Sequence, residues 1–202
     1  ADRAREQARA RVVAEARRRY GAQAKDPQAV PAPLRKTILT VVAQHADEKT
    51  WNSVRAAAAA EKTPLVKTQL YTMLALAEDE SLARRALELA LTPEPGATNS
   101  PEMIAAVAWK HPDLAFDFAT AHLPQVHAML DPFARIVFVP GLAWNSNRSD
   151  IIEKVDRYAS EHLSADSRSR ADATIANIRD RARVQRERLP EIDAWIAKNP
   201  KR

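Results

Sequence analysis

The sequence predicts an all-α fold, a HEAT-like or armadillo-like α-α superhelix of about ten to eleven helices. Three observations predict it. Apolar residues recur at intervals of three and four along most of the 202 residues, which is the spacing of one helix face. Only three glycines occur, and alanine and leucine dominate an apolar fraction of 46%, a composition that favours helix over sheet. Most of the 13 prolines lie between the periodic segments.

Five helices are predicted in the first half of the chain, at about residues 2–20, 34–45, 47–60, 63–77 and 82–91. Gly21 is expected to end the first helix. Thr63 and Pro64 predict a helix start, because a hydroxyl can cap the first turn and proline suits its first position. The residues expected to face inward include Val12, Ala16, Tyr20, Leu34, Ile38, Trp51, Val54, Leu65, Met73, Leu82 and Leu89.

The second half restarts after a proline- and glycine-bearing interruption at residues 92–99. Helices are expected at about residues 100–109, 111–119, 131–139, 149–158, 164–188 and 192–196. Proline lacks a backbone N–H and clashes with the preceding turn. Pro140 with Gly141 is therefore expected to end one helix, and Pro190 to cut the long one. Trp109 and Trp195 lie on apolar stripes and are predicted to be core residues.

One tryptophan lies in a different context. Trp144 follows the Pro140-Gly141 pair and begins a polar segment that includes Asn145, Asn147 and Arg148. Two interpretations are open: the ring packs under a helix end, or it contacts a partner domain or a peptide. These four residues are the candidate peptide or domain contact.

Charge and composition exclude several classes of function. The net charge is +5, and residues 1–36 and 166–202 carry most of the basic excess, with acidic residues interspersed. Since aromatic residues do not alternate with the arginines, no nucleic-acid surface is predicted. The absence of cysteine excludes disulfides and thiolate chemistry. No segment approaches the roughly 20 apolar residues that span a bilayer. We expect a soluble protein, cytoplasmic or periplasmic, and the Arg- and Ala-rich composition suggests a bacterial source.

No complete catalytic or metal site is visible. The five histidines form no HExxH pair of the kind that places two imidazoles on one helix face for zinc. His122 and His127 are separated by Pro124, so they are not expected to share a face. Asp117, between two phenylalanines, is the carboxylate nearest to an apolar setting, and it is predicted to face solvent. No GxSxG, Walker or GxGxxG motif occurs. No catalytic residue and no cofactor are therefore assigned to this chain.

Three segments carry a family resemblance. The first is a tryptophan helix at residues 50–54, followed by residues 62–67, a Leu-Ala-rich stretch at 70–80 and the run at 83–91. The second is the Trp-Lys-His-Pro segment at residues 109–118, and the third runs from residue 151 to Trp195 and Ile196. Their order resembles the C-terminal helical domain of zinc aminopeptidases of the aminopeptidase N, puromycin-sensitive and endoplasmic-reticulum type. The sequence departs from that pattern at residues 98–102, where a basic-polar pair is common in the family.

The resemblance implies a role and a partner. In that family the zinc ligands and the catalytic residues belong to an upstream catalytic domain, and the non-catalytic C-terminal domain covers the active site and gates the access of peptides. The chain is therefore expected to be one helical-repeat domain, residues 1–202, from the C-terminal part of a larger peptidase. The expected partners are the catalytic domain of the same polypeptide and peptide substrates, with zinc in the parent enzyme. The alternative is a free-standing helical-repeat adaptor that binds a protein partner.

Overall fold

The computed structural model describes residues 2–26 and 28–199, and within these ranges it contains helices and no β-strand. This confirms the predicted all-α class. The chain divides into two compact units, Ala1–Lys110 and His111–Arg202, and each is described by itself. No helix in the described ranges is long and apolar enough to cross a membrane.

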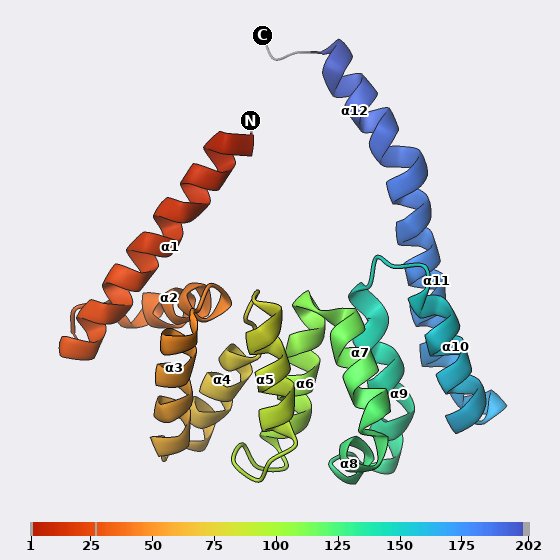
Figure 1. Cartoon of the computed structure of the whole chain (residues 1–202), viewed down its shortest axis with the longest axis horizontal. Helices are drawn as coiled ribbons and strands as arrows, with labels where there is room; N and C mark the ends of the chain where they lie inside the picture. The colour runs from red at the N-terminus through yellow and green to blue at the C-terminus, as the bar shows by residue number, and fades with distance from the viewer. Residues whose placement is uncertain (1, 27, 200–202) are drawn as a thin grey trace. The chain divides into compact units, whose positions relative to one another are not determined.

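The first unit is a series of helix pairs (Figure 1). Its helices are α1 (Asp2–Lys25), α2 (Ala32–Gln44), α3 (Glu48–Ala60), α4 (Pro64–Leu74), α5 (Glu80–Ala90) and α6 (Asn99–Lys110). Helix α1 packs on α2, α3 on α4 and α5 on α6, while α4 also contacts both α2 and α6. The core of this unit is built from Trp51, Tyr71, Leu74, Leu87, Met103 and Ile104, all fully buried. A smaller cluster of Ala16, Val30, Ile38 and Val42 joins α1 to α2.

The second unit contains α7 (Pro112–Ala121), α8 (Leu123–Ala128), α9 (Pro132–Leu142), a 3-10 turn η1 (Ala143–Asn145), α10 (Ile151–His162), a 3-10 turn η2 (Ala165–Ser167), α11 (Ser169–Arg183) and α12 (Leu189–Lys198). Helix α9 packs on α7 and α11, and α10 packs on α11. Phe116, Ile151 and Ile178 are its largest fully buried side chains.

Three predicted helix ends are wrong. Helix α1 continues through Gly21 to Lys25, since glycine can also adopt helical angles and only Gly96, at φ +85°, has a positive φ in the described ranges. Helix α9 continues through Pro140 to Leu142, where Leu142 and Ala143 are buried.

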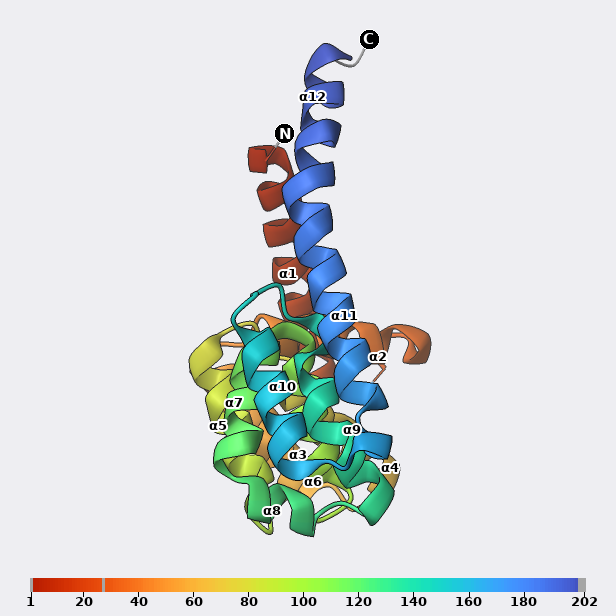
Figure 2. The ribbon, with the colours of Figure 1, turned by 90° about the vertical axis from the view of Figure 1, so that its right-hand side faces the viewer.

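Pro190 does not cut the long C-terminal helix either. Helices α11 and α12 form one rod in Figure 2, joined by a π-helical segment, Val184–Arg188. The N–H of Leu189 donates to the carbonyl of Val184, five residues back. Widening the helix in this way accommodates a residue that lacks a donor and crowds the preceding turn.

Several side chains predicted to be core are exposed. Trp51, Val54, Met73, Leu82 and Leu89 are buried as predicted. The exposed exceptions are Val12, Leu34, Leu65, Trp109 and Trp195. The helical period determines which residues share a face, but a neighbouring element must cover that face before it is buried. For these five side chains no element within residues 2–26 and 28–199 does so completely.

A candidate contact surface on helices α7 and α10

The predicted contact residues lie in the connection between α9 and α10. Two of them, Trp144 and Asn145, contact α11. The guanidinium carbon of Arg170 lies 4.7 Å from the centre of the Trp144 ring. The Trp144 carbonyl accepts a hydrogen bond of 2.8 Å from the Asn177 amide. Asn145 accepts one of 3.3 Å from Arg181. Trp144 and Asn145 are therefore half-buried, and their polar groups are used within the unit.

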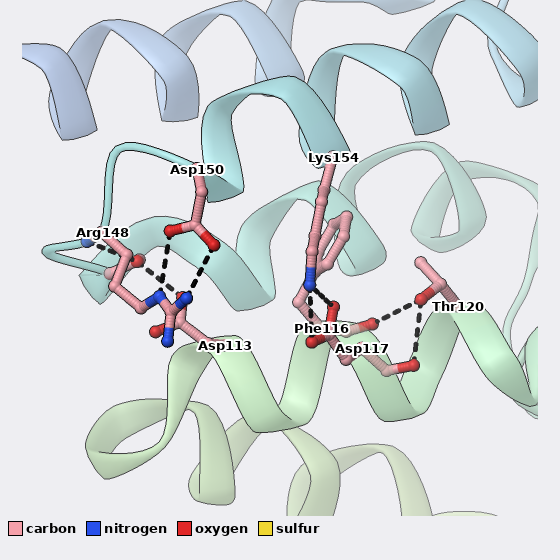
Figure 3. A network of polar contacts seen from close by, with 8 residues as sticks. Asp113, Phe116, Asp117, Thr120, Arg148, Asp150 and Lys154 are labelled. Carbon is pink, nitrogen blue, oxygen red and sulfur yellow. Dashed lines mark hydrogen bonds and ion pairs between the residues drawn. The ribbon is translucent and has the colours of Figure 1, made fainter.

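Asn147 and Arg148, in contrast, are exposed. The Arg148 guanidinium forms a two-bond contact with Asp150, with Nε–Oδ1 at 2.9 Å and Nη2–Oδ2 at 2.7 Å. Figure 3 shows this pair above the first turn of α7. The hydrogen bond from Arg148 keeps the pKa of the Asp150 carboxyl below its usual value. Such a fork-shaped contact fixes the direction of both side chains.

A buried hydroxyl attaches this exposed pair to α7. The Ser146 side chain is fully buried. Its Oγ donates to Asp113 at 2.6 Å and accepts from the Arg148 backbone N–H at 3.1 Å. Because Ser146 uses its hydroxyl in both directions, it holds the start of the α10 connection against the first turn of α7.

A second ion pair lies one turn further along α7. Lys154 of α10 approaches both carboxylate oxygens of Asp117 at 2.7 Å (Figure 3). Asp117 remains about half exposed, at 49% of its side chain. Next to it, the Thr120 hydroxyl bonds the carbonyls of Phe116 and Asp117 at 3.0 Å. Asp113 and Asp117 share one face of α7 because they are four residues apart.

A pocket of about 350 Å³ lies between α1 and α2, and a smaller, more polar one of about 290 Å³ lies beside the Asp117–Lys154 pair. The smaller pocket is lined by Phe116, Asp117, Thr120, Lys154, Arg157, Tyr158, Glu161 and His162. The Phe116 and Tyr158 rings meet edge to face at 6.3 Å, and His162 tilts over Tyr158 at 4.9 Å. Aromatic rings and charged groups thus both line this pocket.

Two groups, Tyr158 in this pocket and His127 beside it, have pKa values shifted toward the neutral form. Burial raises the pKa of Tyr158 to about 12. Burial, together with the charges of Arg135 and His162, lowers the pKa of His127, whose ring nitrogen lies 3.4 Å from the Tyr158 hydroxyl. The pocket can therefore offer aromatic surface and fixed charges to a ligand. This is chemistry for binding a charged, partly apolar segment.

Sequence analysis did not single out Asp113, Lys154 or Arg157, and it read Asp117 only as a solvent-facing carboxylate. The signal that could have found them is spacing. Asp113 and Asp117 are four residues apart in one predicted helix, and Lys154 and Arg157 three apart in another, so each pair was bound to share a face. Which helix faces which could not be read from the sequence.

A metal site is not formed by the residues that the structure describes. Within residues 2–26 and 28–199, no three His, Cys, Asp or Glu side chains are grouped so that they could hold an ion. The zinc that the family resemblance implies is therefore assigned to no residue in these ranges.

Comparison with protein-family models identifies a family over most of the chain. The family model described as the ERAP1-like C-terminal domain matches residues 3–183. No curated protein matches the chain. The family match covers α1 to α11 and ends where the π-helical segment begins.

Proposed function

The chain belongs to the family of ERAP1-like C-terminal domains, and from this premise we propose that it serves a zinc aminopeptidase as a non-catalytic domain. In this proposal the domain covers the active site of the catalytic domain and limits which peptides reach it. The observation that carries the proposal is the family match, which spans nearly all of the helical array.

The α7/α10 surface supports a role in peptide contact. Lys154 and Arg157 of α10 line the pocket together with Phe116 and Tyr158, and Arg148 lies exposed in the connection that precedes α10. Arg148 and Lys154 are paired with Asp150 and Asp117, whereas Arg157 forms no ion pair with a described residue and is the positive group beside the pocket that attracts a carboxylate. We propose that this surface contacts the carboxylate end or acidic side chains of a peptide, with Asn147 and Arg148 at its exposed edge and Trp144 and Asn145 holding that edge in place.

The test uses the whole aminopeptidase polypeptide that carries this domain. Arg148→Ala should lower kcat/KM for peptides of about ten residues and leave an aminoacyl reporter unaffected, because only the longer substrate reaches the α7/α10 surface. The matched control is Arg84→Ala on α5, which breaks a similar exposed pair with Glu80 at 2.8 Å in the other unit. An equal loss for both substrates, or an equal loss in both variants, would contradict the contact role.

A separate assay tests the non-catalytic assignment. The purified chain should not hydrolyse aminoacyl reporters with or without added zinc. Zinc-dependent turnover by the pure chain would overturn the assignment.

The alternative is a free-standing adaptor that binds a protein partner. The gene sequence upstream of Ala1 distinguishes the two proposals. An HExxH motif upstream of Ala1, followed by a Glu some 20 residues later, is the zinc-site signature of a peptidase. A start codon next to Ala1 would favour the adaptor.

A further inference from the structure

The pocket between α1 and α2 is an apolar groove on the surface of the first unit. We call it the α1/α2 groove; its lining residues are Arg11, Val12, Glu15, Ala16, Arg19, Leu34, Thr37, Ile38 and Val41. Ala16 and Ile38 form its buried floor, whereas Val12 is 58% exposed and Leu34 is 42% exposed. Apolar side chains that line a groove and remain in water favour a partner that covers them.

The other side of α2 is already occupied. Leu39 points to that side, where it lines a separate pocket together with Gln69 of α4, and α2 packs on α3 and α4. Leu34, Ile38 and Val41 fall on a different stripe, spaced by four and three residues. The groove lies along the α1–α2 contact and is therefore not part of the contact that joins α2 to α3 and α4.

The rim of the groove is basic. The carboxylate among the lining residues is that of Glu15, which forms ion pairs with Arg18 at 2.8 Å and Arg19 at 2.7 Å. These hydrogen bonds lower the pKa of Glu15 to about 2. Arg11 has no hydrogen-bond or ion-pair partner among the described residues. The Arg11 guanidinium is therefore available to bind a carboxylate at the edge of a partner.

Helix α12 has the complementary surface. Leu189, Ile192 and Ile196 fall on one stripe at spacings of three and four, Trp195 lies beside them, and none of these residues is buried. Asp193 flanks the stripe and has no partner within the described ranges. Helix α12 thus presents an apolar stripe with an uncommitted carboxylate at its edge.

We propose that α12 of a second copy of this chain docks in the α1/α2 groove, with its Leu189–Ile192–Ile196 stripe on Val12 and Leu34 and its Asp193 opposite Arg11. This is helix-in-groove recognition. The contact joins two different surfaces, so it is head-to-tail, and each copy keeps one groove and one α12 free for the next. The inference is independent of the proposed peptidase role.

The contact is expected to be weak. One short helix in a groove belongs to the small interfaces, which are transient, so association should be reversible and rise with protein concentration. Sedimentation velocity of the full chain should show a weight-average mass that increases with concentration beyond the 22.5 kDa monomer. A wild-type chain that stays monomeric over the accessible range would overturn the proposal.

Complementary variants identify the two surfaces. Val12→Glu places a charge in the groove, and Ile192→Glu places one in the α12 stripe. Each variant alone should therefore remain monomeric. Mixed together, they should form a 1:1 dimer that grows no further, since one supplies an intact α12 and the other an intact groove. Phe133→Glu on α9, which replaces a side chain that is 73% exposed outside both surfaces, should associate like wild type.

Two results would overturn the model of the contact. If Ile192→Glu associates normally while Val12→Glu does not, the groove binds a second groove or another surface. If the mixture stays monomeric although both variants keep the wild-type circular dichroism spectrum, α12 is not the occupant.

A charge exchange provides a second test that does not alter the apolar surfaces. Arg11→Asp and Asp193→Arg should each weaken association, and the double variant should restore it. No recovery in the double variant would overturn the Arg11–Asp193 pairing.

Discussion

Trp51 is held by contacts on its edge and on its face. Its indole N–H donates to the carbonyl of Leu74 at 3.1 Å, which is the last residue of α4, where helix carbonyls lack an internal partner. The Arg85 guanidinium lies 4.6 Å from the ring centre, and Arg85 in turn bonds Glu48 and Asn52. A single side chain therefore joins α3, the end of α4 and α5.

This arrangement predicts the effect of Trp51→Phe. Phenylalanine keeps an aromatic ring but leaves the buried Leu74 carbonyl without its donor, which costs roughly 1–3 kcal/mol of unfolding free energy. The matched control is Trp109→Phe, because Trp109 is 67% exposed and should change stability by less than about 0.5 kcal/mol. Urea unfolding followed by circular dichroism measures both, and equal effects would contradict the role given to Trp51.

Glu78 is a second residue that connects distant elements. Its carboxylate contacts Arg9 of α1, His45 at the end of α2 at 3.1 Å, and Lys110 of α6 at 3.0 Å. Its backbone N–H donates to Gln44 at 2.9 Å. Burial alone would raise the pKa of Glu78, but the hydrogen bond from Lys110 and the surrounding positive charges outweigh it and lower the pKa.

The lowered pKa of Glu78 predicts a pH-dependent effect of Glu78→Gln. The ionised carboxylate stabilises the fold above its ordinary value of 4.5, and this contribution is lost as the pH falls through the lower pKa of the folded state. The variant should therefore be less stable near neutral pH by about 1–3 kcal/mol, and the difference should shrink below pH 4.5. Unfolding titrations across this range measure it.

A matched control for Glu78 is Glu80→Gln on α5, since the Glu80 side chain is 62% exposed and pairs with Arg84 on the same helix. Such surface pairs contribute little. A difference between wild type and Glu78→Gln that stays constant with pH, or that Glu80→Gln reproduces, would contradict the assignment.

At the scale of the helix, aspartate starts helices here and threonine does not. Asp47, Asp79 and Asp131 each accept a hydrogen bond from the backbone N–H three residues on, at 2.8, 3.1 and 2.8 Å. Thr63 precedes α4 as predicted, but its side chain forms no cap. Glu61 instead accepts from the N–H groups of Lys62 and Thr63, which precede the first turn of α4, at 2.8 and 2.7 Å.

These caps predict a contrast between two alanine substitutions. Asp131→Ala removes a bond to the Ala134 N–H and should cost about 1 kcal/mol. Thr63→Ala removes no cap bond and should be nearly neutral. Thermal and urea unfolding measure the difference. A loss for Thr63→Ala as large as that for Asp131→Ala would show that the hydroxyl caps α4 after all.

At the scale of the whole molecule, charge is distributed as pairs. The +5 net charge comes from many basic residues, yet most of those with a described contact lie next to a carboxylate. Such pairs are found in both units, for example Arg55–Glu94 at 2.6 Å, Arg85–Glu48 at 3.1 Å and Arg168–Asp156 at 2.6 Å. Paired charges provide no continuous basic stripe for a phosphate backbone.

The chain should therefore not form a stable complex with nucleic acid. Fluorescence anisotropy with a labelled single strand and a labelled duplex should show no binding at physiological salt, and any binding at low salt should fall steeply as salt is added. Binding that persists at physiological salt would contradict this expectation and point to a surface in which bases stack on aromatic side chains.

The sequence by itself determined the helical class, most helix starts, and the core around Trp51, Met73 and Leu82, because the helical period and the proline and aspartate start signals act within one or two turns. Its spacing also implies shared faces for Asp113 with Asp117 and for Lys154 with Arg157, although the sequence analysis did not single out these pairs. The tertiary structure alone decided that α7 faces α10, so that Lys154 meets Asp117, and that Trp109 and Val12 are exposed. Burial and ion pairing depend on which element lies opposite, and helical periodicity contains no information about the neighbour.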